Sequence, residues 1–220
     1  MLQIKSLKKS YTQGAQEVKI YEDLNFHMKK ASRVAIMGKS GSGKSTLLSL
    51  ISGIIKPTSG DILLDGVSYK DMKEEQINDF RASNIGFVFQ NFHLVSYLNA
   101  LENVMLPAKV CGIKNPKEKA VELLQSVGLG HRLDHLPSEL SGGEKQRVAI
   151  ARALIHNPKI ILADEPSGNL DEETGIAVMD KLFELIKKNN TTLILVTHSK
   201  DVAARCEETY SLNHGNLEKC

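Results

Sequence analysis

Apolar side chains recur with a period of two in parts of this chain, which predicts strands with one buried face. Leu24, Phe26 and Met28 alternate with polar neighbours in this way. Other apolar stretches are continuous and short, as in strands buried on both faces of a parallel sheet. These runs occupy residues 33–37, 85–89, 160–163 and 193–197.

A β-hairpin is predicted at the pair Asp65-Gly66. The residues on either side, 61–64 and 67–69, are strand-like. Asp-Gly favours the left-handed backbone conformations that a tight two-residue turn requires. The two short strands are therefore expected to pair with each other.

Helical patterns separate the strands. Residues 45–52 predict a helix that stops at Gly53, and residues 92–157 are mostly helical in pattern. Strands that alternate with helices predict a parallel α/β sheet, with the long helical stretch as an insert. A further helix is predicted before the last apolar strand, with one apolar face formed by Ile176, Met179, Leu182, Phe183 and Ile186.

Composition and charge exclude several classes of protein. Of 220 residues, 41% are hydrophobic and 25% charged, which is ordinary for a globular protein and excludes a disordered chain. Lys and Arg total 28 against 26 Asp and Glu, a net charge of +2. With no long block of like charge, we expect no nucleic-acid partner.

Secretion and membrane signals are not expected from the sequence. The first residues lack the apolar core of a signal peptide, and the longest charge-free run, residues 82–101, contains too many polar groups for a membrane span. Cys111, Cys206 and Cys220 are odd in number and widely spaced. We therefore expect reduced thiols in a cytoplasmic protein, and neither a disulfide framework nor a zinc site.

A glycine-rich segment after the first apolar strand has the spacing G-x-x-x-x-G-K-[ST]. Its glycines let backbone N–H groups and the next helix N-terminus surround phosphate oxygens. Lys44 is placed to neutralise the β- and γ-phosphates and Ser45 to offer its hydroxyl to Mg²⁺. The alternative is a turn that binds nothing. The predicted phosphate loop comprises Gly38, Lys39, Ser40, Gly41, Ser42, Gly43, Lys44 and Ser45.

Residues of a candidate site follow all four continuous apolar strands. Gly38 begins the phosphate loop, Gln90 follows the second strand, Asp164 and Glu165 the third, and His198 the fourth. Ligands of open α/β sheets bind outside the carboxyl ends of the strands. We therefore expect one site at this edge, where an acidic residue can hold a metal and a second can orient water. The alternative is that each group only caps a turn.

These residues resemble the nucleotide-binding subunit of ATP-binding-cassette (ABC) transporters over nearly the whole chain. Residues 140–144 (LSGGE) resemble the signature loop of that family, residues 160–165 its Walker B strand and residues 168–171 (GNLD) its D-loop. Gln90 and His198 match its Q- and H-loop residues. The resemblance implies a P-loop NTPase with a mostly parallel central sheet, an N-terminal antiparallel β-subdomain and an inserted α-helical subdomain.

The resemblance also implies that the chain hydrolyses ATP, with Mg²⁺ as cofactor. Glu165 orients or deprotonates the attacking water, while His198 and Lys44 contact the γ-phosphate. Tyr11 matches the aromatic residue that stacks on adenine. The implied Mg²⁺ ligands, direct or through water, are Ser45, Gln90 and Asp164. The implied ATP contacts are Tyr11, residues 38–46 with Thr46 included, Gln90, Ser141, Gly143, Glu144 and Asp171.

The signature loop departs from the family at Glu144, where the usual residue is Gln. Ser141 and Glu144 also form the sequence of a capping box, so the motif predicts a well-capped helix in either case. A carboxylate at this position opposes anion binding unless it points back to the cap. One chain carries each motif once, so the resemblance implies a head-to-tail homodimer in which Ser141 and Gly143 of each chain contact the ATP of the other.

Within the family, residues 165–171 (EPSGNLD) and the extended segment 11–18 resemble the lipoprotein-releasing, macrolide-efflux and antimicrobial-peptide-resistance exporters. That subgroup implies a subunit on the cytoplasmic face of the cell membrane that powers a separate permease. The permease is expected to dock near residues 92–98, although Leu94 and Leu98 are equally suited to the core of the helical insert. The implied domains are a core at residues 1–91 and 158–220 and a helical subdomain at residues 92–157.

Two other functions fit the same motifs. A regulatory ABC ATPase drives a membrane partner without moving a substrate, and nothing in this sequence separates it from a transporter. A soluble ABC ATPase that acts on nucleic acid or ribosomes usually carries coiled-coil insertions or two cassettes in one chain. This sequence has neither.

Overall fold

The computed structural model describes residues 1–13 and 16–220. The chain divides into two compact units. The first unit comprises Met1–Arg81 and Thr192–Cys220, and the second comprises Ala82–Thr191. The phosphate loop therefore lies in the first unit, and the signature loop in the second.

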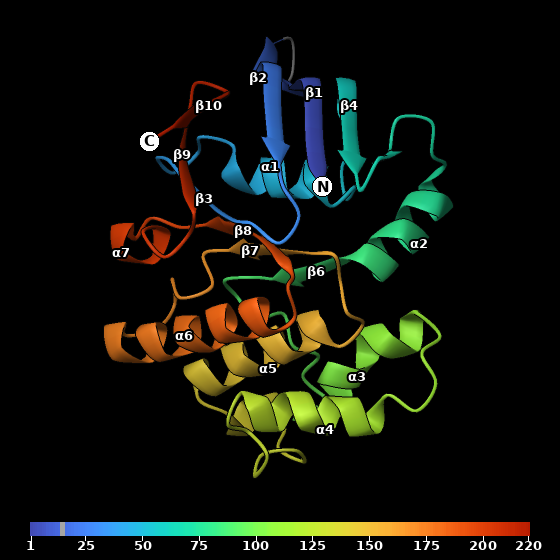
Figure 1. The fold of residues 1–220 in the computed structure, drawn as a ribbon, viewed down its shortest axis with the longest axis vertical. Coiled ribbons are helices and arrows are strands. Elements are labelled where there is room, and N and C mark those ends of the chain that lie inside the picture. The colour runs from blue at the N-terminus through green and yellow to red at the C-terminus, as the bar shows by residue number, and fades with distance from the viewer. Residues whose placement is uncertain (14–15) are drawn as a thin grey trace. The chain divides into compact units, whose positions relative to one another are not determined.

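The first unit contains an antiparallel sheet with the strand order β2-β1-β4-β5, of which Figure 1 shows β2, β1 and β4 side by side. In the second half of β2, apolar positions are buried and alternate positions exposed, so the predicted half-buried strand is confirmed. The predicted hairpin is also confirmed, because Leu64 pairs with Val67 across the turn at Asp65-Gly66. These strands are β1 (Leu2–Gln13), β2 (Gln16–Met28), β4 (Ser59–Leu64) and β5 (Val67–Ser68).

The other strands of the first unit pair mostly in parallel. Strand β3 pairs in parallel with both β8 and β9, and β10 pairs antiparallel with β9. The predicted strands at residues 33–37 and 193–197 and the predicted helix at 45–52 are confirmed to within one residue at each end. These elements are β3 (Arg33–Met37), α1 (Lys44–Ile51), β8 (Thr192–Val196), α7 (Lys200–Ala203), β9 (Glu208–Asn213) and β10 (Asn216–Lys219).

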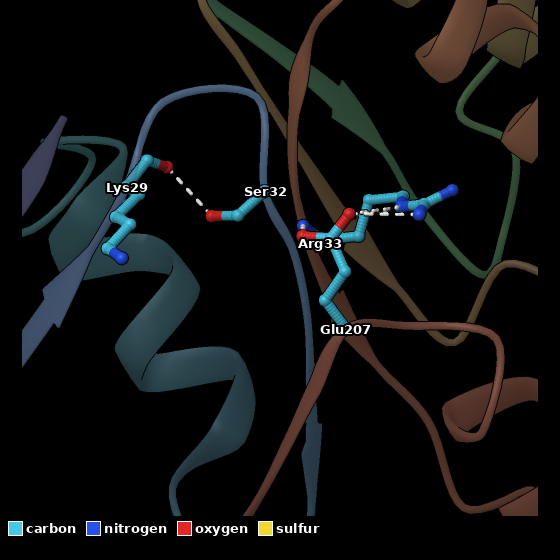
Figure 2. A network of polar contacts seen from close by, with 4 residues as sticks. All are labelled: Lys29, Ser32, Arg33 and Glu207. Carbon is cyan, nitrogen blue, oxygen red and sulfur yellow. Dashed lines mark hydrogen bonds and ion pairs between the residues drawn. The ribbon is translucent and has the colours of Figure 1, made fainter.

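An ion pair fixes the start of β3. Arg33 donates to Glu207 Oε1 through Nε at 3.2 Å and Nη2 at 2.9 Å (Figure 2). The Arg33 backbone N–H donates to the other carboxylate oxygen at 3.0 Å. The turn before β3 is closed by Ser32, whose hydroxyl donates to the Lys29 carbonyl at 2.7 Å. The start of β3 is thus tied to the residue that directly precedes β9.

The second unit holds a short parallel strand pair, β6 and β7, and a group of helices. Helix α5 contacts α3, α4 and α6 (Figure 1). The predicted strands at residues 85–89 and 160–163 and the mostly helical pattern of residues 92–157 are confirmed. Its elements are β6 (Ile85–Val88), α3 (Ala100–Val110), α4 (Lys117–Ser126), the 3₁₀ helix η1 (Pro137–Glu139), α5 (Gly142–Leu154), β7 (Ile160–Asp164) and α6 (Glu172–Lys188); helix α2 (Glu74–Asn84) begins in the first unit and ends in the second.

One residue of the predicted apolar face of α6 is exposed instead of buried. Met179, Leu182, Phe183 and Ile186 are buried as expected, but Ile176 is 54% exposed. Ile176 lies in the first two turns of the helix, before the stretch in which every position of that face is covered. Within residues 1–13 and 16–220, no helix has both the length and the apolar character of a membrane span. The domain boundaries expected from the sequence stay a prediction.

Candidate functional site

The phosphate loop begins at the carboxyl end of β3 and is closed by the side chain of Lys44. Lys44 is only 6% exposed, and its ammonium group donates to the carbonyls of Gly38 at 2.9 Å and Lys39 at 2.8 Å. The loop is further closed by a hydrogen bond from the Ser42 N–H to the Lys39 carbonyl. The cation is therefore held over the loop by backbone acceptors, which agrees with the predicted role of Lys44 at a phosphate.

A buried tyrosine anchors the end of the loop. The Tyr21 hydroxyl donates to the Gly43 carbonyl at 2.7 Å, and burial raises the pKa of Tyr21 well above its usual value. Gly43 has φ 102° and precedes α1, and a Cβ there would lie 2.7 Å from the Tyr21 oxygen. The motif glycine thus satisfies both a left-handed conformation and a close approach. Tyr21 itself carries no sequence signal for this role, because the contact is made across 22 residues.

The donors at this loop fit a phosphate group. Among the described residues, no side chain caps the N-terminus of α1, and its first turn carries no acidic residue. The Ser42 hydroxyl is buried and has no hydrogen-bond partner in the described part of the chain. A cavity of about 510 Å³ is lined by residues 39–42 of the loop, together with residues of β2 and residues 212–215. Uncommitted N–H and O–H donors beside an ammonium group are what a phosphate accepts from.

His198 lies at the same edge of the sheet as the phosphate loop. Ile36 of β3 pairs in parallel with Val196 of β8, and the Thr197 N–H donates to the Ile36 carbonyl at 3.2 Å. Gly38 and the exposed His198 therefore leave neighbouring strands in the same direction. Two of the four groups predicted at strand ends, Gly38 and His198, thus lie at one edge of the sheet within the first unit.

Tyr11 lies in β1 opposite Val18 of β2 and is 43% exposed. The Lys9 ammonium lies 4.7 Å from the centroid of its ring, a cation–π contact on a face that adenine could otherwise use. The assignment of Tyr11 to adenine stays a prediction. Of the extended segment 11–18 that carried the subgroup resemblance, residues 14–15 lie outside the described residues.

In the second unit, the two carboxylates and the glutamine lie at one edge of the strand pair β6–β7. Val88 pairs in parallel with Ala163, so Gln90 and Asp164 leave adjacent strands in the same direction. Glu165 follows with φ 45°, a left-handed conformation that a non-glycine residue rarely adopts. Residues held in such conformations are common at active sites, which agrees with the predicted role of Glu165.

Asn169 joins Gln90 to the predicted D-loop. The Gln90 amide donates to Asn169 Oδ1 at 3.0 Å, and the Asn169 amide donates to the Gln90 carbonyl at 3.2 Å and to Asn91 Oδ1 at 2.7 Å. Asp171 caps α6, because its carboxylate accepts from the Thr174 N–H at 2.9 Å, a bond that lowers the pKa of the carboxyl. Asn169 is part of the motif, but nothing in the motif indicates that its side chain links the D-loop to Gln90.

The signature loop forms the capping box that its sequence predicts. The Ser141 hydroxyl accepts from the Glu144 N–H at 3.2 Å, and the Glu144 carboxylate accepts from the Ser141 N–H at 2.8 Å. A Cβ on Gly143 would lie 2.3 Å from the Thr174 methyl carbon, so glycine is also required for α5 to approach α6. The first intrahelical bond runs from Lys145 N–H to the Ser141 carbonyl. The Glu144 N–H is taken by the Ser141 hydroxyl, and the N–H groups of Gly142 and Gly143 have no acceptor within the helix.

Glu144 points back to the cap. Its second carboxylate oxygen accepts from Arg132 Nε at 3.0 Å, an ion pair that the sequence did not indicate. The Ser141 N–H, together with the Arg132 guanidinium, lowers the pKa of the Glu144 carboxyl below its usual value. The arrangement therefore meets the condition under which a carboxylate in this position leaves the helix N-terminus open to an anion.

Comparison with known proteins decides the family. The family model described as ABC transporter matches residues 21–168. The chain belongs to the ABC transporter family. Two solved structures of the cassette MJ0796 match this ABC protein with a TM-score of 0.91 at 39% identity, covering 99% of this chain and 97% of theirs. One is described as a dimeric post-hydrolysis state bound to ADP and Pi, the other as a dimeric bacterial ABC transporter cassette.

Curated relatives match this ABC protein along almost its whole length. The lipoprotein-releasing system ATP-binding protein LolD of Legionella pneumophila (strain Paris) is 48% identical over 219 residues, 99% of this chain and 96% of the relative. LolD of Treponema denticola is 43% identical over 218 residues, with 98% and 96% coverage. YbbA of Escherichia coli (strain K12), named an uncharacterized ABC transporter ATP-binding protein, is 46% identical over 221 residues, with 100% and 97% coverage.

The family and fold class predicted from the sequence are thereby confirmed. The chain is an ABC ATPase, its reaction is the hydrolysis of ATP, and its cofactors are ATP and Mg²⁺. The roles of the individual site residues stay predictions. They rest on the motif positions, which the structure places at strand ends and helix starts within each unit.

Proposed function

We propose that this ABC ATPase powers a separate membrane exporter whose cargo is a lipid-modified protein. The observation that carries the proposal is the whole-length similarity, at 43–48% identity, to proteins named for lipoprotein release in different bacteria. The relative YbbA, with 46% identity, has no cargo in its name. Cargo is therefore the part of the proposal that an experiment has to address first.

The working form is a homodimer that binds ATP between its two chains. One chain carries a single phosphate loop and a single signature loop, so two chains in head-to-tail order complete two sites. Dimeric solved structures of the similar cassette MJ0796 support this arrangement. The start of α5, with its N–H groups and the hydroxyl of the exposed Ser141, is the surface that each chain offers to the ATP of the other.

Within this dimer the residues of the chain have distinct tasks. Lys44, fixed by two carbonyls, holds the β- and γ-phosphates, and Ser42 supplies a buried hydroxyl donor. Mg²⁺, when bound, neutralises charge on the phosphates; the groups available to hold it are those of Ser45, Gln90 and Asp164. Glu165 orients the attacking water and accepts its proton. His198 contacts the γ-phosphate.

The permease is proposed to dock on the segment 92–98 of the second unit. Phe92 and His93 have positive φ values of 57° and 47°, and Arg152 of α5 donates to both of their carbonyls. The buried Asn103 of α3 accepts from the Val95 N–H at 2.8 Å, and its amide group, with two hydrogens to donate, lies within hydrogen-bond distance of three carbonyls in residues 95–99. Side chains thus hold the backbone of the segment, while Tyr97 is 81% exposed.

The hydrogen bonds that hold segment 92–98 also connect the proposed docking surface to residues of the ATP site. Arg152 belongs to the helix that begins at the signature loop, and Gln146 of the same helix donates to the Phe89 carbonyl at 3.2 Å, next to Gln90. A force on the segment is therefore transmitted to α5 through the hydrogen bonds of Arg152. From α5 it reaches the residue before Gln90 through the hydrogen bond of Gln146. Such an arrangement suits a subunit that converts ATP binding into movement of a permease.

A reconstituted transporter tests the proposal. The subunit is purified in mild detergent together with the membrane protein that accompanies it. The complex of the two is then reconstituted into lipid vesicles. We expect ATP hydrolysis to rise when an acylated lipoprotein is present and to stay at its basal rate with the same protein lacking its acyl chains. Equal rates with both would contradict the cargo assignment. Copurification of a membrane protein without any transport domain would favour the regulatory alternative.

A further inference from the structure

The acidic residue of the signature loop poses an electrostatic problem for the proposed dimer. A helix N-terminus attracts anions, and the start of α5 is the surface proposed to bind the partner chain's ATP. Glu144 places a carboxylate in the first turn of this helix. An unpaired negative charge here would repel phosphate, in the place where the family usually carries a neutral glutamine.

Both oxygens of this carboxylate are engaged inside the second unit. Oε2 accepts from the Ser141 N–H at 2.8 Å, and Oε1 accepts from Arg132 Nε at 3.0 Å. The Glu144 side chain is 14% exposed and that of Arg132 is 35% exposed. The pair is therefore partly withdrawn from water, where salt screens less strongly than at a fully exposed ion pair.

The position of Arg132 is itself fixed. Its Nη1 lies 2.9 Å from His135 Nε2, and its loop is tied to the start of α3 through the Ala100 N–H, which donates to the His135 carbonyl at 2.9 Å. The Leu101 N–H donates to the Leu133 carbonyl at 3.0 Å. The guanidinium is thus presented to the signature helix from a loop that a second helix holds in place.

We propose that Arg132 is a positioning residue for the signature loop. It holds the Glu144 carboxylate against the Ser141 N–H and balances its charge, which leaves the first turn of α5 able to bind the ATP of the partner chain. The inference rests on the proposed ATP-bound dimer. It assigns to Arg132 the electrostatic compensation for the acidic residue of this chain's signature loop.

The test measures dimer formation with ATP and needs no turnover. All variants carry Glu165→Gln, which is expected to retain ATP, and the dissociation constant of the dimer is measured by analytical ultracentrifugation with ATP and Mg²⁺. We expect Arg132→Met to raise this constant by about tenfold, as befits one unbalanced charge near the phosphates. Glu144→Gln removes the charge that Arg132 balances and is measured as the single-variant reference for the double variant.

The double variant Arg132→Met with Glu144→Gln separates charge balance from packing. If Arg132 acts by balancing Glu144, removing both charges restores the dissociation constant to within about twofold of the parent. The effect of Arg132→Met alone should also decrease at higher salt. Arg132→Lys keeps the charge and is expected to stay within about threefold, which provides a second variant if Arg132→Met does not fold.

Arg33→Met is the matched control. It breaks another arginine–glutamate pair, Arg33 with Glu207, at the start of β3 in the first unit (Figure 2). Its melting temperature without nucleotide is expected to fall, while the dimer dissociation constant stays at the parent value. A comparable rise in that constant for Arg33→Met would show that loss of any such pair suffices, and would overturn the inference.

Other outcomes also decide the question. A parent Glu165→Gln protein that forms no dimer with ATP overturns the proposed dimer, and the role of Arg132 with it. A parent that dimerises while Arg132→Met dimerises equally well overturns the role of Arg132 alone. A double variant as weak as Arg132→Met shows that the arginine acts through packing, which also contradicts the charge-balance proposal.

Discussion

Glu165 carries backbone strain in addition to its position at the end of β7. A non-glycine residue with φ 45° costs about 1–3 kcal/mol relative to a relaxed conformation. Such strained residues cluster at active sites, so the conformation of Glu165 agrees with its proposed role toward the attacking water.

Glu165→Gln is expected to bind ATP normally and to lose steady-state hydrolysis by at least about a hundredfold. The amide keeps the size and the hydrogen bonding of the side chain but does not accept a proton, a step that typically contributes 10²- to 10⁴-fold. Phosphate release and ATP binding are the measurements. Glu173→Gln, an exposed glutamate in the first turn of α6, is the control and should retain full turnover. Near-normal hydrolysis by Glu165→Gln would refute the assignment.

Tyr21→Phe tests the anchor of the phosphate loop. The variant removes the hydroxyl that donates to Gly43, while the Leu47 N–H still donates to the same carbonyl at 2.9 Å. We therefore expect the free energy of unfolding to fall by only about 1 kcal/mol, measured by urea denaturation. Tyr210→Phe removes a hydroxyl bonded to Glu208 and serves as the control, with a smaller loss expected. An unchanged stability for Tyr21→Phe would show that the bond is not stabilising.

At the level of elements, the start of α5 combines a packing role with a proposed binding role. Gly143→Ala brings a Cβ to 2.3 Å from the Thr174 methyl carbon on α6. We expect the unfolding free energy to fall by about 1–3 kcal/mol, as for overpacked cores, in a urea titration. The measurement alone does not separate helix packing from ATP contact, so a second substitution is needed.

Thr174→Ser removes the clashing methyl group. The double variant Gly143→Ala with Thr174→Ser is expected to recover most of the lost stability, because the Asp171 cap uses the Thr174 backbone N–H and is unaffected. If dimer formation with ATP stays impaired although stability recovers, Gly143 is needed at the ATP surface as well. Recovery of both would leave only the packing role.

Local sequence signals were sufficient for many elements and insufficient for others. The hairpin at Asp65-Gly66 and the buried strands rest on patterns within a few residues, and both were predicted. Strand β1 was not predicted as an element, because a register shift between Ile4 and Leu7, at Ser6 with φ 44°, interrupts its period-two pattern. Helix α2 was missed because Ile77 is its only buried residue among those described.

The residues of the candidate site also divide into those that local motifs predict and those that they do not. Motif spacing predicted Lys44, Glu165 and the capping box of the signature loop, since each depends on neighbours in sequence. The partners that hold them could not be predicted in this way. Tyr21, Arg132 and Asn169 act across 22, 12 and 79 residues respectively, and such contacts exist only after the chain has folded.

For the whole molecule, the decisive question is how the ATP site communicates with a membrane partner. The segment 92–98 is held by Arg152 and Asn103 through its backbone, so its exposed side chains contribute little to the fold. Tyr97, at 81% exposure, is the large apolar side chain most available to a partner among the described residues. An aromatic residue in this setting is typical of an interface anchor.

Tyr97→Glu is expected to abolish copurification with the permease while leaving the isolated subunit folded and able to bind ATP. The charge would have to be buried in the docked complex, which is costly without a partner charge, whereas in the free subunit it remains in water. Detergent copurification, circular dichroism and an ATP-binding assay measure the three properties.

Ile176→Glu is the matched control, because Ile176 is also an exposed apolar residue of the second unit, at 54%, but lies on α6 away from the segment in sequence. It should copurify normally. Normal copurification of Tyr97→Glu would place the docking surface elsewhere, and unfolding of the isolated variant would show that Tyr97 supports the fold instead.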